Sequence, residues 1–203
     1  MINIGILNLG INNIKSITKA CEEMGKTYIL NDASDFLVKT EILILPGNGN
    51  FETGIKLIKD LKFDKLIYDF YNSKKKIITI CLGLHLLMND SEEAKGIKGL
   101  SLIKGSVKKI DDKNFKIPLL GWYDVNFRNK NFKTKSFFFN NSFKVVPEDL
   151  SIIEGEIIND IPAFIKYKNL YGFQFHPEKS SFQGLSLLKK LIEEYNKVYF
   201  IYF

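Results

Sequence analysis

The sequence contains few cysteines, with only Cys21 and Cys81 among its 203 residues. They lack metal-like spacing and are too few for the disulfide framework of a small secreted protein. No apolar run approaches the roughly 20 residues that a membrane-spanning helix needs. The opening MINIGILNLG also lacks the basic segment and the cleavage site of a signal peptide. We therefore expect a cytoplasmic protein without a zinc site, a disulfide or a membrane segment.

Arginine is scarcer still, since Arg128 is the single arginine behind a formal net charge of +6. Readout of base edges and bidentate phosphate clamps both favour arginine. The lysines are scattered, and the run KKK at 74–76 is short and precedes an apolar stretch. We interpret the positive charge as a solvated lysine surface and predict no nucleic-acid partner.

The first half of the chain alternates apolar strands with helices. A chain of this length with 45% hydrophobic residues can bury one substantial core, so a single domain over residues 1–203 is expected. Apolar strands buried on both faces are typical of a parallel sheet between helices, which predicts an α/β fold. We expect strands at 2–9, 27–30, 41–47 and 76–80, and helices at 12–26 and 51–73.

The second half has a different texture, with strand-like segments and little helix between them. This pattern predicts antiparallel or mixed sheet in the C-terminal half. The chain closes with an expected helix at about 182–196 that carries a leucine-rich apolar face. The strand-like segments are 100–110, 118–127, 136–146, 151–158 and 163–169.

The stretch TICLGLHLL places Cys81 where a buried strand turns into a helix. Active-site residues concentrate at the carboxyl ends of parallel strands. The pattern resembles a nucleophile elbow, with Gly83 as a small residue and Thr79 in the place of the first glycine. N–H groups at the start of the following helix would favour a thiolate. The alternative is a plain core cysteine.

A second glycine-containing turn, LPGNGNF at 45–51, ends the preceding core strand. Its two glycines surround Asn48 and allow the loop to turn backbone N–H groups toward a developing oxyanion. The alternative is a generic turn between a strand and a helix. The pattern is not a phosphate loop, because neither G-x-x-x-x-G-K-[ST] nor G-x-G-x-x-G occurs here.

The chain has only two histidines, and each is a candidate partner for Cys81. In FHPE at 175–178, residues two apart in an extended segment project to one side, so Glu178 is expected to orient His176. His85 lies one helical turn from Cys81 and has no acidic residue three or four positions later. Acid–base catalysis depends first on geometry, which favours His176 as the general base. An ordinary core or surface histidine remains the alternative for His176.

These three segments together resemble the class I (triad) glutamine amidotransferases, in the same order and at similar intervals over essentially the whole chain. The segments LNLGINNIKSI, PLLGWYDV and SFFFNNSFKVVP are most similar to the glutaminase subunit of imidazole glycerol phosphate synthase. The resemblance implies hydrolysis of glutamine to glutamate and ammonia without a metal or cofactor. It also implies a heterodimer with a (β/α)₈ cyclase, which uses the ammonia to form imidazole glycerol phosphate and aminoimidazole carboxamide ribotide in histidine biosynthesis.

The resemblance also implies a role for each matching residue. Cys81 would be the nucleophile, His176 the general base and acid, and Glu178 the orienting carboxylate. The remaining matches are Gly47, Asn48, Gly49 and Leu82 for the oxyanion hole, and His85, Glu93, Ser142 and Phe143 for glutamine binding.

Several positions depart from the family pattern. His85 replaces the usual glutamine, Asn141-Ser142-Phe143 replaces His-Ser-Tyr, and Tyr123 replaces the asparagine of Gly-Trp-Asn. These departures keep two alternatives open. One is a paralogous glutaminase whose partner amidates a cell-surface sugar precursor, and the other is a catalytically silent glutamine-binding subunit. In the family the oxyanion loop becomes competent when the partner binds its substrate, so the isolated chain is expected to have little activity.

Overall fold

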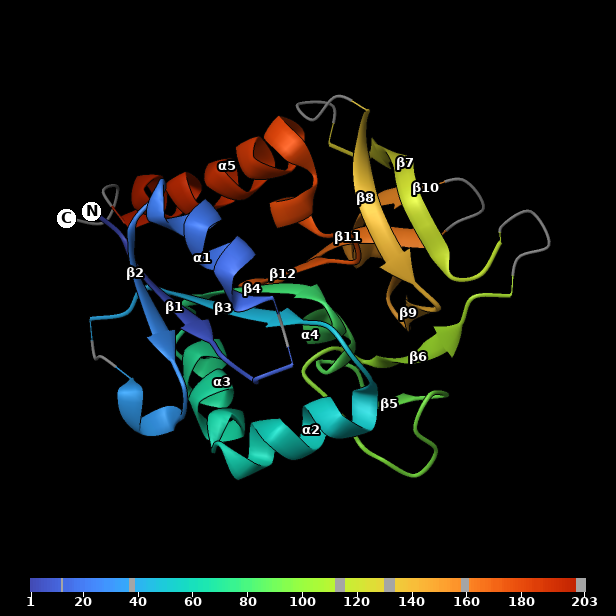
Figure 1. Ribbon diagram of the computed structural model, residues 1–203, viewed down its shortest axis with the longest axis horizontal. Helices are drawn as coiled ribbons and strands as arrows, with labels where there is room; N and C mark the ends of the chain where they lie inside the picture. The colour runs from blue at the N-terminus through green and yellow to red at the C-terminus, as the bar shows by residue number, and fades with distance from the viewer. Residues whose placement is uncertain (12, 37–38, 112–115, 130–133, 158–160, 200–203) are drawn as a thin grey trace.

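The computed structural model describes residues 1–11, 13–36, 39–111, 116–129, 134–157 and 161–199, which form two sheets and flanking helices (Figure 1). The strands are β1 Asn3–Leu7, β2 Lys26–Leu30, β3 Ile42–Gly47, β4 Lys76–Cys81, β5 Asp90–Ser91, β6 Gly105–Lys109, β7 Leu119–Phe127, β8 Lys135–Asn141, β9 Phe143–Pro147, β10 Ile153–Ile157, β11 Ile161–Tyr167 and β12 Leu170–Phe173. The helices are α1 Ile14–Glu22, α2 Phe51–Asp60, α3 Phe63–Asn72, α4 Leu82–His85 and α5 Ser181–Tyr199, with 3₁₀ turns η1 Ala33–Asp35, η2 Leu150–Ile152 and η3 Pro177–Lys179.

The larger sheet has the order β2-β1-β3-β4-β12-β11-β10-β7-β8 among the described residues. The pairs from β2 to β12 are parallel, and those from β12 to β8 are antiparallel. The predicted α/β fold, with a parallel first half and antiparallel strands in the second, is therefore confirmed. The smaller sheet has the order β5-β6-β9.

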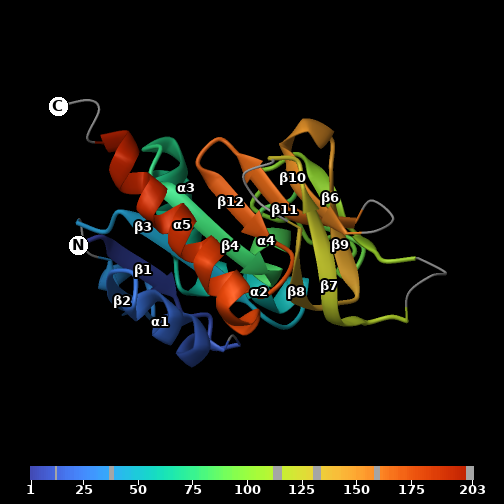
Figure 2. The ribbon, with the colours of Figure 1, turned by 90° about the horizontal axis from the view of Figure 1, so that it is seen from above.

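Helices cover both faces of the parallel strands, as their apolar composition predicted. In β3, Ile42 and Ile44 belong to the core beneath α1 and α5, while Leu43 and Leu45 belong to the core beneath α2 and α3. All four side chains are fully buried, and each such burial stabilises the fold by about 1.5–3 kcal/mol. Figure 2 shows α5 lying across the strands on the side that α1 also covers.

The predicted helix at 51–73 was wrong in one respect, because the structure has two helices there. The chain breaks between α2 and α3 at Lys62, which adopts a left-handed conformation with φ of 57°. No glycine or proline marks this break in the sequence. The turn lets Phe51 and Phe63, the first residues of the two helices, enter the same core.

The predicted strand at 136–146 is likewise divided. It turns at Ser142, so that β8 joins the large sheet and β9 joins the small one. This division places a turn, rather than a continuous strand, at the end of β8.

Cys21 is a buried core residue on α1, as predicted. Burial, with smaller effects from Glu178 and Glu22, raises the pKa of its thiol to about 12. Such a thiol is inert near neutral pH. Within the described part of the chain, no helix has the length and apolar composition to cross a membrane.

Candidate active site

Cys81 ends β4 at a strained turn. Its φ of 53° and ψ of −111° lie outside the backbone conformations that residues other than glycine favour. Helix α4 begins at the next residue. Such strain is typical of a nucleophile held above a sheet. A Cβ atom at Gly83 would lie 2.0 Å from the carbonyl oxygen of Leu45, so only glycine fits this turn. The turn therefore has the geometry of the predicted elbow.

The glycine-containing loop lies next to Cys81 because β3 and β4 are parallel neighbours in which Gly47 pairs with Cys81. A Cβ atom at Gly47 would lie 2.6 Å from the backbone nitrogen of Gly83, so the two turns pack with no room for a side chain. Gly49 has a φ of +113°, and Asn50 caps α2 by accepting a 2.9 Å hydrogen bond from the Thr53 N–H. The exposed residues Asn48 and Gly49 of this loop and the start of α4 are therefore close to the cysteine.

His176 and Glu178 form a buried pair, with Nδ1 of His176 2.9 Å from Oε1 of Glu178. The contact was predicted, but the backbone conformation that makes it differs from the prediction. Glu178 lies in the 3₁₀ turn η3, not in an extended segment. The backbone N–H of His176 donates to Phe138 O at 3.0 Å, and the Ser180 hydroxyl donates to His176 O at 2.6 Å. These two bonds fix the backbone of His176, and the contact with Glu178 orients its imidazole.

The protonation state of His176 depends on its two neighbours. Burial alone would lower its pKa, but the adjacent Cys81 and Glu178 outweigh burial and raise the pKa to about 9. Because Glu178 holds Nδ1, Nε2 is the nitrogen directed to other groups, and this buried atom has no hydrogen-bond partner among the described residues. The arrangement favours an imidazolium beside the cysteine at neutral pH.

A cavity of about 240 Å³ opens over Cys81. It is lined by eight of the predicted site residues and by two asparagines that the predicted set omitted, Asn140 and Asn141. The lining residues are Asn48, Gly49, Cys81, Leu82, His85, Glu93, Asn140, Asn141, Ser142 and Phe143. Of the predicted set, Gly47, His176 and Glu178 do not line it, and the last two are buried.

His85 has a distant partner that its local sequence did not reveal. Its Nε2 lies 3.0 Å from Oε1 of Gln174, and both side chains are buried. Burial lowers the pKa of His85 to about 4, although the Gln174 hydrogen bond partly offsets the effect. His85 is therefore a neutral imidazole at physiological pH. Gln174 precedes His176 by two residues, and this closeness was the only sequence signal that could have suggested it.

Glu93 connects the cavity to the glycine-containing loop. Its Oε2 accepts a 2.9 Å hydrogen bond from the backbone N–H of Phe51, the first residue of α2, and its own N–H donates to Ser91 Oγ at 3.1 Å. A carboxylate is favourable at a helix N-terminus. It also places negative charge in the cavity wall, where a ligand ammonium group could bind.

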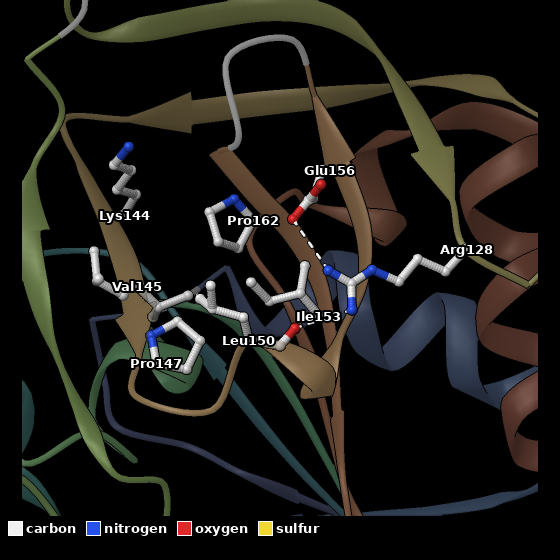
Figure 3. Close-up of a pocket in the computed structure, with 9 residues that line it drawn as sticks. Arg128, Lys144, Val145, Pro147, Leu150, Ile153, Glu156 and Pro162 are labelled. Atoms are coloured by element: carbon white, nitrogen blue, oxygen red, sulfur yellow. Dashed lines mark hydrogen bonds and ion pairs between the residues drawn. The ribbon is translucent and has the colours of Figure 1, made fainter.

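A second cavity, of about 340 Å³, lies near β9 and β10 and has mostly apolar walls (Figure 3). The Arg128 guanidinium donates to Leu150 O at 3.0 Å and lies 3.8 Å from the Glu156 carboxylate. Arg128 therefore links two other residues that line this cavity. None of the predicted site residues lines this cavity.

The fold and the site together define a class of enzyme, since a buried Cys-His-Glu set stands above a parallel sheet beside a glycine-containing loop. The family model described as glutamine amidotransferase class-I matches residues 6–193, and the chain belongs to this family.

Among curated proteins, it is 36% identical over 197 residues to the imidazole glycerol phosphate synthase subunit HisH of Methanocaldococcus jannaschii, covering 94% of this chain and 98% of that protein. It is 33% identical over 199 residues to the HisH subunit of Halalkalibacterium halodurans, and the match covers 92% of this chain and 93% of that protein.

Solved structures agree on the fold. A crystal structure of a glutamine amidotransferase superposes with a TM-score of 0.74 at 15% identity, covering 94% of this chain and 98% of the other. The structure of PurLQS from Thermotoga maritima gives a TM-score of 0.71 at 17% identity, and the match covers 95% of this chain and 98% of the other. The family model and the curated relatives confirm the predicted family, whereas the individual residue roles stay predictions.

Proposed function

We propose that this chain is the glutaminase subunit of an imidazole glycerol phosphate synthase. It hydrolyses glutamine and delivers ammonia to a (β/α)₈ cyclase, which forms imidazole glycerol phosphate and aminoimidazole carboxamide ribotide. The observation that carries the proposal is the buried set of Cys81, His176 and Glu178, of which Cys81 lines a cavity of about 240 Å³. The relatives with the HisH name favour this pathway over a sugar-amidating paralogue.

In the first half of the reaction, the Cys81 thiolate attacks the side-chain carbonyl carbon of glutamine. The carbonyl electron pair moves to oxygen, and backbone N–H groups of Leu82 and the loop at 47–49 stabilise this oxyanion. The His176 imidazolium donates its Nε2 proton to the leaving nitrogen. Ammonia departs, and a γ-glutamyl thioester remains on Cys81.

In the second half, neutral His176 accepts a proton from a water that attacks the thioester. The C–S bond breaks, glutamate leaves, and the thiolate–imidazolium pair is restored. Glu178 keeps Nδ1 protonated throughout, so that Nε2 always faces the reacting atoms. Water and glutamine are consumed, and glutamate and ammonia are the only products.

Ammonia released into water would mostly become unreactive ammonium, so a sheltered partner site is needed. An apolar strip beside the cavity supports such docking. Leu120 and Trp122, two residues apart on β7, are 59% and 51% exposed. Leu120 pairs with Asn140, which lines the cavity over Cys81. The rings of Trp122 and Phe138 pack edge to face, with their centroids 6.1 Å apart. Exposed apolar strips of this kind are typical of protein interfaces.

The decisive test is a coupled assay of the purified chain with its genomically adjacent barrel protein. We expect little glutaminase activity from the chain alone and an increase of orders of magnitude when the partner and the histidine-pathway nucleotide are added. Stimulation by a sugar nucleotide instead would reject the histidine pathway. Full turnover without a partner would reject the expectation that the oxyanion loop becomes competent only when the partner binds its substrate.

A labelling experiment tests catalytic competence separately. An electrophilic glutamine analogue should modify Cys81 in the complex and fail to modify Cys81→Ala. The buried Cys21 provides an internal control for non-specific reaction. Absence of labelling in the wild-type complex would support the catalytically silent alternative.

A further inference from the structure

The sulfur of Cys81 has a hydrogen-bonding neighbour on β8. Asn141, the last residue of β8, places its Nδ2 3.3 Å from Sγ of Cys81, within hydrogen-bonding range for a sulfur acceptor. Its side chain is only 4% exposed and lines the cavity over Cys81. The ladder pairing with Leu119 on β7 holds the backbone of this residue in place.

The orientation of the Asn141 amide follows from its second contact. Its Oδ1 accepts the backbone N–H of Asn140 at 3.2 Å. If the amide were flipped, its NH₂ group would face that N–H donor and its oxygen would face the sulfur. The contact between the two donor groups would be unfavourable whatever the state of Cys81, and an oxygen facing the sulfur would be unfavourable for a thiolate, so the N–H group of the amide faces Cys81.

We propose that Asn141 is a permanent hydrogen-bond donor to the Cys81 sulfur, which favours the thiolate and aims it into the cavity. Hydrogen bonds to an ionised acceptor are roughly twice as strong as neutral ones. An amide does not titrate, so its donor is present at every pH, unlike that of the histidine that the family usually has at this position. The significance for turnover rests on the proposed glutaminase function, but the hydrogen bond itself does not.

The same strand also fixes the other half of the pair. Phe138 lies on β8 three residues before Asn141, and its carbonyl accepts a hydrogen bond from the backbone N–H of His176. β8 thus contacts both the Cys81 sulfur and the backbone of His176. The donor acts at two stages, because sulfur is negative before it attacks glutamine and again when it leaves the thioester. In the thioester the sulfur is neutral and accepts the hydrogen bond only weakly.

Alkylation of Cys81 by iodoacetamide tests this role without glutamine or a partner, so failure of the glutaminase proposal would not affect the result. The rate is followed at the Cys81 peptide by mass spectrometry, at pH 6.5 and pH 10. We expect Asn141→Ala to react about tenfold more slowly at pH 6.5 and at nearly the wild-type rate at pH 10, where thiols ionise without help.

Two further variants make the result specific. Asn141→Asp keeps the side-chain shape but presents a carboxylate to the sulfur, and we expect it to be slowed at pH 6.5 at least as much as the alanine variant. Asn126→Asp adds the same charge at the end of β7 away from Leu119 and should react like the wild type. Wild-type reactivity of either Asn141 variant at pH 6.5, or equal slowing at both pH values, would overturn the proposal. If the alanine variant does not fold, the isosteric aspartate variant decides alone.

Discussion

Replacing His85 by glutamine tests whether a buried neutral imidazole makes the fold sensitive to acid. Glutamine can keep the hydrogen bond to Gln174, which is 3.0 Å from His85 Nε2, and it is the usual family residue at this place. Glutamine does not titrate, so only the proton-linked part of stability should change. We expect His85→Gln to fold and to retain glutaminase activity with the partner.

The magnitude follows from the pKa of His85, which burial lowers from 6.5 to about 4. Because the folded-state pKa is the lower one, the unfolded chain takes up the proton first as the pH falls. His85 therefore costs no stability above about pH 6.5, and its cost grows between pH 6.5 and 4. At 1.36 kcal/mol per pH unit, the loss reaches about 2 kcal/mol at pH 5 and about 3 kcal/mol at pH 4.

Urea unfolding of both proteins between pH 8 and pH 4.5 measures this difference directly. All other titrating groups are shared, so their effects cancel when the two free energies of unfolding are subtracted. His176 belongs to the shared set and acts in the opposite direction. Its raised pKa of about 9 contributes stability below pH 6.5 that is lost as the pH rises through 9. A difference between the two proteins that stays constant from pH 8 to pH 4.5 would refute the assignment of His85 as a buried neutral group.

Three other substitutions test separate parts of the structure. Glu178→Gln should lower turnover in the complex at least about a hundredfold while thermal unfolding stays cooperative, because an amide no longer holds the His176 imidazolium; near-normal kcat would contradict the orienting role. Gly83→Ala should destabilise the protein by about 3 kcal/mol or more in urea, since the new Cβ would lie 2.0 Å from Leu45 O. Trp122→Ala should weaken partner affinity by about 2 kcal/mol in calorimetry with little change in folding, and unchanged affinity would place the docking surface elsewhere.

The sequence by itself determined the parts of the protein that depend on neighbouring residues. The apolar strands, the elbow at Cys81 and the glycine-containing loop are local patterns, and each could be located from a few consecutive residues. His176 and Glu178 are two residues apart, so their contact could also be predicted, although the turn that makes it was expected to be extended.

Only the tertiary structure decided which distant groups meet at the sulfur. β12 pairs with β4 so that Phe173 lies beside Ile80, and the segment after β12 therefore delivers His176 to the end of β4. The pairing of strands is set by packing across the whole sheet, and no local pattern encodes it. The contacts from Gln174 to His85 and from Asn141 to Cys81 depend on the same long-range arrangement.

The break between α2 and α3 shows the same limit on a smaller scale. Lysine at position 62 carries no signal for a left-handed residue, yet it adopts φ of 57° because the two helices can then share one core. A lysine in this conformation costs about 1 kcal/mol, and the burial of Phe51 and Phe63 outweighs that cost. Local sequence set which elements could form, and packing decided where they end and which functional groups they bring together.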